Sequence, residues 1–170
     1  MNQEIAEILE YLEPREDYVI WAGFAQFAHL RIKPSPDIDI FVQNLNTKNR
    51  VSADFQKKGW KKLLYKGFYK YHDKLEKSRT TFDIVYSEPA VKLFFSTRMK
   101  IEVEGYSLYF LSPEALFLTK IGQLTVAKRS SEKRERDWQT VNTLRNKINI
   151  KKLKELVSKL PDSYWAVGWI

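Results

Sequence analysis

The stretch YVIWAGFAQFAHLRIKPSPDIDIFV, residues 18–42, predicts a strand, a glycine turn, a short helix and a second strand. The second strand contains Asp37 and Asp39, although aspartate is depleted in strands because its short side chain competes for backbone hydrogen bonds. Side chains two residues apart on a strand point to the same face, roughly 6–7 Å apart along the backbone. The two carboxylates therefore lie side by side, and their charges repel.

Two carboxylates on one strand face stay ionised together only if a positive charge lies between them, since otherwise one of them takes up a proton. A hard divalent cation supplies that charge. Mg²⁺ uses one or two carboxylates and fills the rest of its coordination shell with phosphate oxygens from a substrate. The aspartate pair therefore indicates chemistry on a phosphate, with Mg²⁺ or Mn²⁺ as the expected cofactor.

The same stretch resembles the signature of the nucleotidyltransferase superfamily. A hydrophobic strand ends in Ala22-Gly23, and Asp37-Ile38-Asp39-Ile40 follows after a spacer of thirteen residues. In that family the glycine turn opens a helix near the nucleotide phosphates, and the two acids hold metal ions. The resemblance implies nucleotide contacts at Gly23 and Phe24. This chain departs from the signature because Ala22 and Phe24 flank Gly23, so the turn has no serine for a phosphate.

The segment 80–86, TTFDIVY, predicts another strand, on which Asp83 faces away from its apolar neighbours. The resemblance implies that Asp83 is the third acid of the site, a metal ligand that also orients or deprotonates the acceptor hydroxyl. Three acids on neighbouring strands suit phosphoryl transfer with two metal ions. The alternative places Asp83 at a strand edge, pointing to water. Arg31 and Lys33 either face a phosphate or are solvated loop charges.

Outward from these strands, apolar spacing predicts the remaining elements. Helices are expected over 2–13, 24–30, 46–60, 115–129, 131–148 and 149–160, and strands over 18–22, 37–42, 80–86 and 101–111, the last as two strands around Gly105-Tyr106. The aromatic runs KLLY (62–65) and GFYKYH (67–72) predict a hairpin around Lys66-Gly67.

The C-terminal half begins with a strong helix start, Ser112-Pro113-Glu114. Lys120 lies in the apolar helix that follows, and 134–137 (RERD) lies in the next one. This order is similar to stand-alone bacterial and archaeal nucleotidyltransferases, including relatives of abortive-infection toxins, and it implies nucleotide binding by Lys120 and Arg136. A buried lysine otherwise snorkels to the surface or pairs with an anion, and Asp137 is the candidate partner. Thr140 replaces an acid common in the family.

Bulk composition limits the other possibilities. The chain has 170 residues, 44% of them hydrophobic, and no cysteine, which excludes disulfides, thiolate metal sites and cysteine catalysis. Its formal net charge of +8 favours anionic partners. No apolar run reaches the length of a membrane span, so we expect a cytoplasmic protein without membrane contact. The aromatic tail 164–170 is expected to dock on the domain or on a second copy.

Together these patterns predict an α/β (α+β) fold with a nucleotidyltransferase-like mixed sheet, flanked by helices. Residues 1–111 would form the catalytic core, and 112–170 a helical part packed on it as one compact unit. The expected function is metal-dependent transfer of a nucleotide from a nucleoside triphosphate, such as ATP, to a hydroxyl of RNA, protein or a small molecule.

Two other functions are alternatives to nucleotide transfer. The first is a catalytically degenerate protein of the same fold that binds nucleotide or RNA, or pairs with an antitoxin-like protein. The sequence also leaves undecided whether the protein forms a homodimer. A metal-dependent nuclease is disfavoured, because its acid-x-Lys motif is absent from Asp83-Ile84-Val85.

Overall fold

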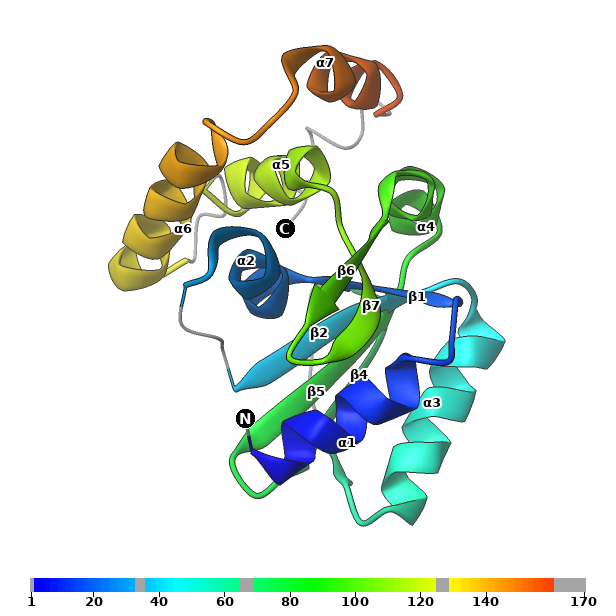
Figure 1. Cartoon of the computed structure of the whole chain (residues 1–170). Helices are drawn as coiled ribbons and strands as arrows, with labels where there is room; N and C mark the ends of the chain where they lie inside the picture. The colour runs from blue at the N-terminus through cyan, green and yellow to red at the C-terminus, as the bar shows by residue number, and fades with distance from the viewer. Residues whose placement is uncertain (1, 33–35, 65–68, 125–128, 161–170) are drawn as a thin grey trace. The chain divides into compact units, whose positions relative to one another are not determined.

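The computed structural model describes residues 2–32, 36–64, 69–124 and 129–160 (Figure 1). The chain divides into two compact units, Met1–Leu111 and Ser112–Ile170. Three features with sequence predictions lie outside the described residues: Lys33, the Lys66-Gly67 turn and the aromatic tail 164–170.

Unit 1 is built on a mixed sheet, which confirms the predicted fold class. In the described residues seven strands pair in the order β3-β4-β5-β2-β1-β7-β6. The two central strands β2 and β5 run parallel, whereas β1 and β4 run antiparallel to them. The strands are β1 (Tyr18–Trp21), β2 (Asp37–Val42), β3 (Lys61–Leu63), β4 (Tyr71–Lys77), β5 (Thr80–Tyr86), β6 (Met99–Val103) and β7 (Tyr106–Phe110).

The helices agree with the sequence prediction except for one addition and shifted ends. They are α1 (Gln3–Leu12), α2 (Ala22–Leu30), α3 (Leu45–Lys57), α4 (Glu88–Phe94), α5 (Pro113–Leu124), α6 (Ser131–Leu144) and α7 (Ile150–Ser158), with a 3-10 turn at Phe95–Thr97. Helix α4 was not predicted, although Ser87 at its N-cap and Pro89 in its first turn are start signals. Helix α3 ends before Gly59, whose φ of +87° breaks the helical path.

The sheet has two different faces because side chains alternate along each strand. On one face, Ile38 and Ile40 of β2 are fully buried. Helices α1 and α3 cover this face, with the Phe55 ring 5.0 Å from Tyr11 and 4.8 Å from Phe82. The opposite face carries Asp37, Asp39 and Phe41, and α4 covers only its Phe41 end. The acids are therefore left on a partly open surface.

Unit 2 consists of three helices in the residues described. The Ser112 hydroxyl accepts a hydrogen bond from the Ala115 N–H (3.2 Å), as expected for the predicted start of α5. Buried Glu114 of α5 accepts a hydrogen bond from the Asn149 N–H at 2.7 Å, just before α7. This bond ties two distant segments of unit 2 together.

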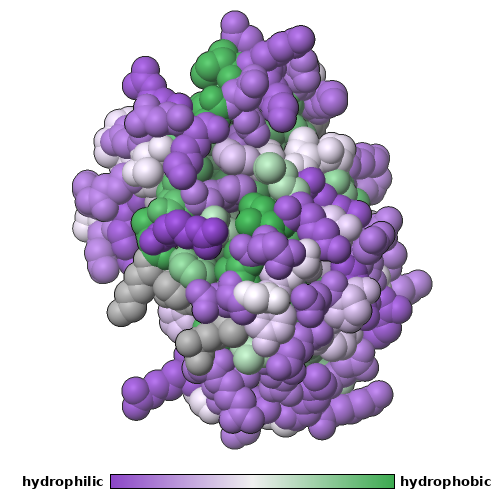
Figure 2. Space-filling model, in the orientation of Figure 1, coloured by the Kyte–Doolittle hydropathy of each residue, from purple (hydrophilic) through white to green (hydrophobic). Residues whose placement is uncertain are grey.

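Polar residues dominate the visible surface, with apolar side chains in smaller areas between them (Figure 2). Across the described ranges, no helix combines the length and apolarity needed to cross a membrane.

Asp73 is a buried acid on the apolar, helix-covered face of β4. It accepts hydrogen bonds from Lys48 of α3 (2.5 Å) and forms an ion pair with Lys62 of β3 (2.7 Å). Burial raises the pKa of Asp73, but hydrogen bonds from the two lysines outweigh burial and hold this pKa below the ordinary aspartate value. The ionised form of Asp73 therefore stabilises the fold.

We expect Asp73→Asn to lower the free energy of unfolding by about 2 kcal/mol at pH 7, because buried Lys48 loses its counter-charge. A depressed folded-state pKa stabilises the fold above the unfolded value of about 3.9 and ceases to do so as the pH falls through the folded value. Urea unfolding at several pH values should therefore show the difference from wild type shrinking below about pH 4. Glu88→Gln, which removes an exposed ion pair with Lys92, is the control and should change little. An equal difference at every pH would contradict the interpretation.

The turn between β1 and α2 holds Ala22 at a φ of +54°, in the left-handed region. An L-residue there costs about 1–2 kcal/mol, whereas glycine adopts this conformation freely but loses more entropy on folding. We therefore expect Ala22→Gly to raise the free energy of unfolding by about 0.5–1 kcal/mol.

Ala25→Gly is the matched control for this substitution, because Ala25 is buried within the same helix. It should lower the free energy of unfolding by about 1 kcal/mol, since glycine disfavours a helix interior. Urea unfolding measures both variants. Destabilisation by Ala22→Gly would show that the turn is not strained by its alanine.

Candidate functional site

The predicted acids come together because of the strand register. Across the sheet, Lys74 of β4 is the backbone partner of Asp83 on β5, Asp83 is the partner of Asp39 on β2, and Asp39 is the partner of Trp21 on β1. Partners directly opposite one another in a sheet share a face. Asp37 lies on that face too, two residues before Asp39. The three predicted acids thus share one surface of two neighbouring strands.

Asp37 and Asp39 are the partly exposed acids of this surface. The hydroxyl of Thr81, the β5 partner of Asp37, donates a hydrogen bond to Asp37 Oδ1 at 2.8 Å. The same hydroxyl lies 3.4 Å from Asp83 Oδ2. Thr81 therefore links the first acid to the third.

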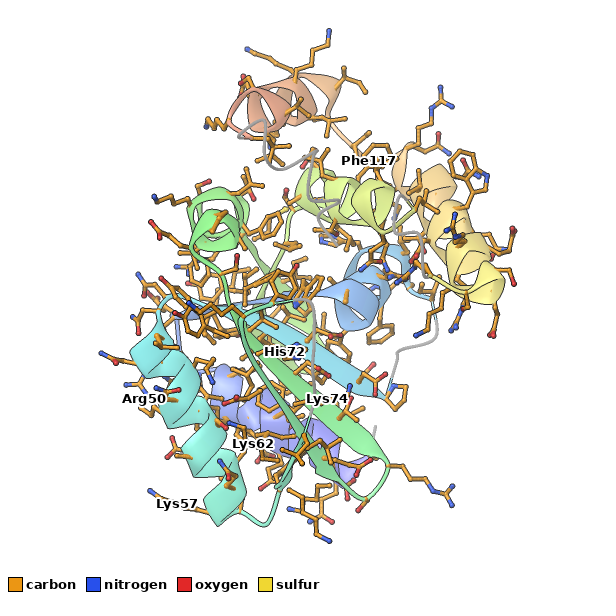
Figure 3. All side chains as sticks on the ribbon, turned by 180° about the vertical axis from the view of Figure 1, so that it is seen from behind. Arg50, Lys57, Lys62, His72, Lys74 and Phe117 are labelled. Atoms are coloured by element: carbon orange, nitrogen blue, oxygen red, sulfur yellow. The ribbon has the colours of Figure 1, made fainter. Side chains whose placement is uncertain are left out.

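Asp83 differs from the other two acids because it is 5% exposed and both of its oxygens accept strong hydrogen bonds. His72 Nε2 donates to Oδ1 at 2.6 Å, and Lys74 Nζ donates to Oδ2 at 2.9 Å. Both donors extend from β4 (Figure 3). Burial raises the pKa of Asp83, but the hydrogen bonds from His72 and Lys74 outweigh it and hold this pKa below the ordinary value.

Lys74 is the cation of this surface. Burial lowers the pKa of Lys74, but its hydrogen bond to Asp83 and the charges of Asp83, Asp37 and Asp39 raise it above the ordinary lysine value. The ammonium group therefore experiences the field of all three acids. Its side chain is 26% exposed, compared with 7% for that of Asp83.

Sequence reasoning missed His72, Lys74 and Thr81, although a signal for them exists. The strand β4 was expected to end at His72, whereas it continues to Lys77 and turns into β5 through only Ser78 and Arg79. Counting back from that two-residue turn pairs Lys74 with Asp83.

The fit of this surface to a divalent metal rests on its carboxylates. Asp37 and Asp39 offer oxygen ligands on one face, which is the chemistry that Mg²⁺ and Mn²⁺ accept. Both oxygens of Asp83 already accept hydrogen bonds. Within the ranges that the structure describes, no group of three acid or histidine side chains is arranged to hold a metal ion. The chemistry of Asp37 and Asp39 suits a metal, and metal binding by all three acids stays a prediction.

The residues predicted to contact nucleotide near the turn have different environments. Gly23 lies in the first turn of α2, beside Ala22. The Phe24 side chain is 1% exposed and packs near Phe27 and Phe110. A nucleotide contact at Phe24 would therefore involve its backbone and not its side chain. Arg31 is exposed and ends α2 with a φ of +57°.

The two predicted nucleotide ligands of unit 2 also differ from each other. Lys120 is 5% exposed and donates to Asp137 Oδ1 at 2.9 Å. Asp137 also accepts a hydrogen bond from Arg129, so the partner considered for Lys120 is the one observed. Arg136 is exposed and pairs with Glu132 at 3.4 Å on the same helix. Nucleotide binding by Lys120 and Arg136 stays a prediction.

Comparisons with known proteins place the fold. No protein-family model matches the chain, and no curated protein matches its sequence. The structure is similar to the crystal structure of ANT(2")-Ia in complex with adenylyl-2"-tobramycin, with a TM-score of 0.65 and 15% identity over 90% of this chain and 92% of that one. It is also similar to the lincomycin-bound lincosamide antibiotic adenylyltransferase LnuA, with a TM-score of 0.60 and 14% identity over 85% and 96% of the two chains.

A third similar structure is an antigenic nucleotidyltransferase-like protein from Paracoccidioides brasiliensis, with a TM-score of 0.59 and 13% identity over 98% of this chain and 90% of that one. In each comparison the likeness extends over most of both chains. The protein therefore has the nucleotidyltransferase fold, as the signature around Gly23, Asp37 and Asp39 led us to expect.

Proposed function

We propose that this protein is a metal-dependent nucleotidyltransferase, which moves a nucleotide from a nucleoside triphosphate to a hydroxyl group. The observation that supports the proposal most is the strand register, which gathers Asp37, Asp39 and Asp83 on one partly open sheet face. A structural role alone does not account for the partly exposed Asp37 and Asp39, because aspartate is depleted in strands.

In the proposed reaction, Asp37 and Asp39 would hold Mg²⁺ or Mn²⁺, which would neutralise charge on the triphosphate. The acceptor oxygen forms a bond to the α-phosphorus while the bond from that phosphorus to the bridging oxygen breaks. Pyrophosphate leaves with the electron pair, and the hydroxyl proton passes to the Asp83 carboxylate. Asp83 is ionised at neutral pH because His72 and Lys74 lower its pKa, so it orients the hydroxyl as an acceptor of its hydrogen bond.

Small molecules are the first acceptor class to test, ahead of RNA and protein. Two of the similar structures carry antibiotic ligands, an adenylylated tobramycin and a lincomycin, and this chain spans at least nine-tenths of each of those proteins. The net charge of +8 opposes the approach of a polycationic acceptor. The panel of acceptors to be tested therefore contains neutral and anionic hydroxyl compounds as well as the antibiotics. ATP is the first nucleotide to test with them.

A second candidate function is nucleotide binding without transfer. It is supported by the hydrogen bonds that both oxygens of Asp83 already accept, and by Phe24 after Gly23, which leaves the turn without a serine for a phosphate. A protein of this kind would bind a nucleoside triphosphate and release no pyrophosphate.

We expect Asp39→Asn to weaken binding of the preferred nucleoside triphosphate in Mg²⁺ by roughly 100-fold, because even indirect support of a metal ligand is worth 10–100-fold. Calorimetry with ATP, CTP, GTP and UTP, with and without Mg²⁺, measures the effect. Asp54→Asn is the control, because Asp54 bonds Tyr11 on α1, which covers the opposite face, and should bind like wild type.

Pyrophosphate release separates the two candidate functions. Wild type should release pyrophosphate with at least one acceptor of the panel, and Asp37→Asn should not. Binding without release for every acceptor favours the second candidate. Folded wild-type protein that binds none of the four nucleotides would rule out both.

A further inference from the structure

We propose that Lys74 takes the place of a second metal ion in this site, so that the protein works with a single divalent cation held by Asp37 and Asp39. This inference rests on the proposed nucleotidyl transfer and concerns how its charges are balanced.

The position of Lys74 carries the first step of the argument. Its backbone on β4 lies opposite Asp83 on β5, and Asp83 in turn lies opposite Asp39 on β2. Its Nζ is 2.9 Å from Asp83 Oδ2, and the charges of Asp37 and Asp39 act on it as well. A fixed positive charge thus already lies where three acids meet.

The coordination of Asp83 carries the second step. A second divalent ion needs a carboxylate on the β5 side of the site, and Asp83 is the one that β5 supplies within the described residues. Each of its two oxygens already accepts a hydrogen bond, from His72 at 2.6 Å and from Lys74 at 2.9 Å. A divalent ion bound there would lie against the ammonium group, and like charges at that distance repel strongly in a buried setting.

Charge balance is consistent with this arrangement. One divalent cation neutralises Asp37 and Asp39, and the Lys74 ammonium neutralises Asp83. His72 has a side chain only 9% exposed and fixes the other oxygen of Asp83, so it acts as a positioning residue for the Lys74–Asp83 pair. The Lys74 side chain is 26% exposed, so it is partly open to a ligand bound over the acids.

The test counts bound Mn²⁺ by electron paramagnetic resonance, in the presence of a non-hydrolysable analogue of the nucleotide that binds best. Wild type should hold one Mn²⁺ per chain, without the line broadening that two closely spaced Mn²⁺ ions produce. Lys74→Met should release Asp83 for a second ion and give two Mn²⁺ per chain with broadening. Lys74→Arg keeps the charge and should stay at one.

Two controls separate this inference from fold stability and from the proposed function. Lys62→Met removes a lysine that pairs with Asp73 on the opposite face and should leave the count at one. Asp83→Asn should change Mn²⁺ affinity less than threefold, whereas Asp39→Asn should abolish binding. This comparison decides the matter if Lys74→Met does not fold.

Several results would overturn the inference. They are two Mn²⁺ in wild type, a count of one in folded Lys74→Met, or an equal loss of Mn²⁺ in Asp83→Asn and Asp39→Asn. Two Mn²⁺ in wild type, or an equal loss in the two aspartate variants, would leave the proposed nucleotidyl transfer intact. A count of one in Lys74→Met would also leave it intact, provided that pyrophosphate is released. Absence of both nucleotide and Mn²⁺ from folded wild type overturns the inference and the proposed function together.

Discussion

The parallel pairing of β2 with β5 is the constraint on which the site depends. It places Asp39 opposite Asp83 and Asp37 opposite Thr81, while the alternate residues Ile38, Ile40, Phe82 and Ile84 are fully buried on the other face. A shift of one residue between these strands would bury aspartates in the apolar layer and expose isoleucines. Core packing and acid alignment are therefore fixed by the same register, and neither changes without the other.

On both faces of β4, a buried carboxylate is compensated by basic side chains that contact it. Asp73 points to the helix-covered face, where Lys48 and Lys62 contact it, and Asp83 on the neighbouring strand contacts Lys74 and His72 on the opposite face. Removing one partner of such a pair leaves a charge without compensation in a poorly solvated place. The Asp73 cluster joins α3, β3 and β4, whereas the Asp83 cluster lies beside the two acids proposed to bind metal. The first is structural by position, and the second belongs to the site for which we propose a chemical role.

Much of the fold followed from the sequence because its signals are local. Strand 37–42 and strand 80–86 have the predicted bounds. The first alternates aspartate with isoleucine, and the second is rich in β-branched and aromatic residues. The extension of β4 to Lys77 was not anticipated, because it depends on the pairing of β4 with β5. For the site, the three acids were found from their unusual presence in strands. Lys74 and His72 were not, because lysine and histidine are unremarkable in a strand until the pairing partner is known.

The tight connection between β4 and β5 restricts how this protein can change over generations. Only Ser78 and Arg79 separate the paired residues Lys77 and Thr80, so the hairpin turn is short. A slip of β4 by one position against β5 would turn Asp73 toward the acids and Lys74 into the apolar layer. Changes in the turn should therefore be tolerated only where the loop absorbs them and Lys77 stays paired with Thr80.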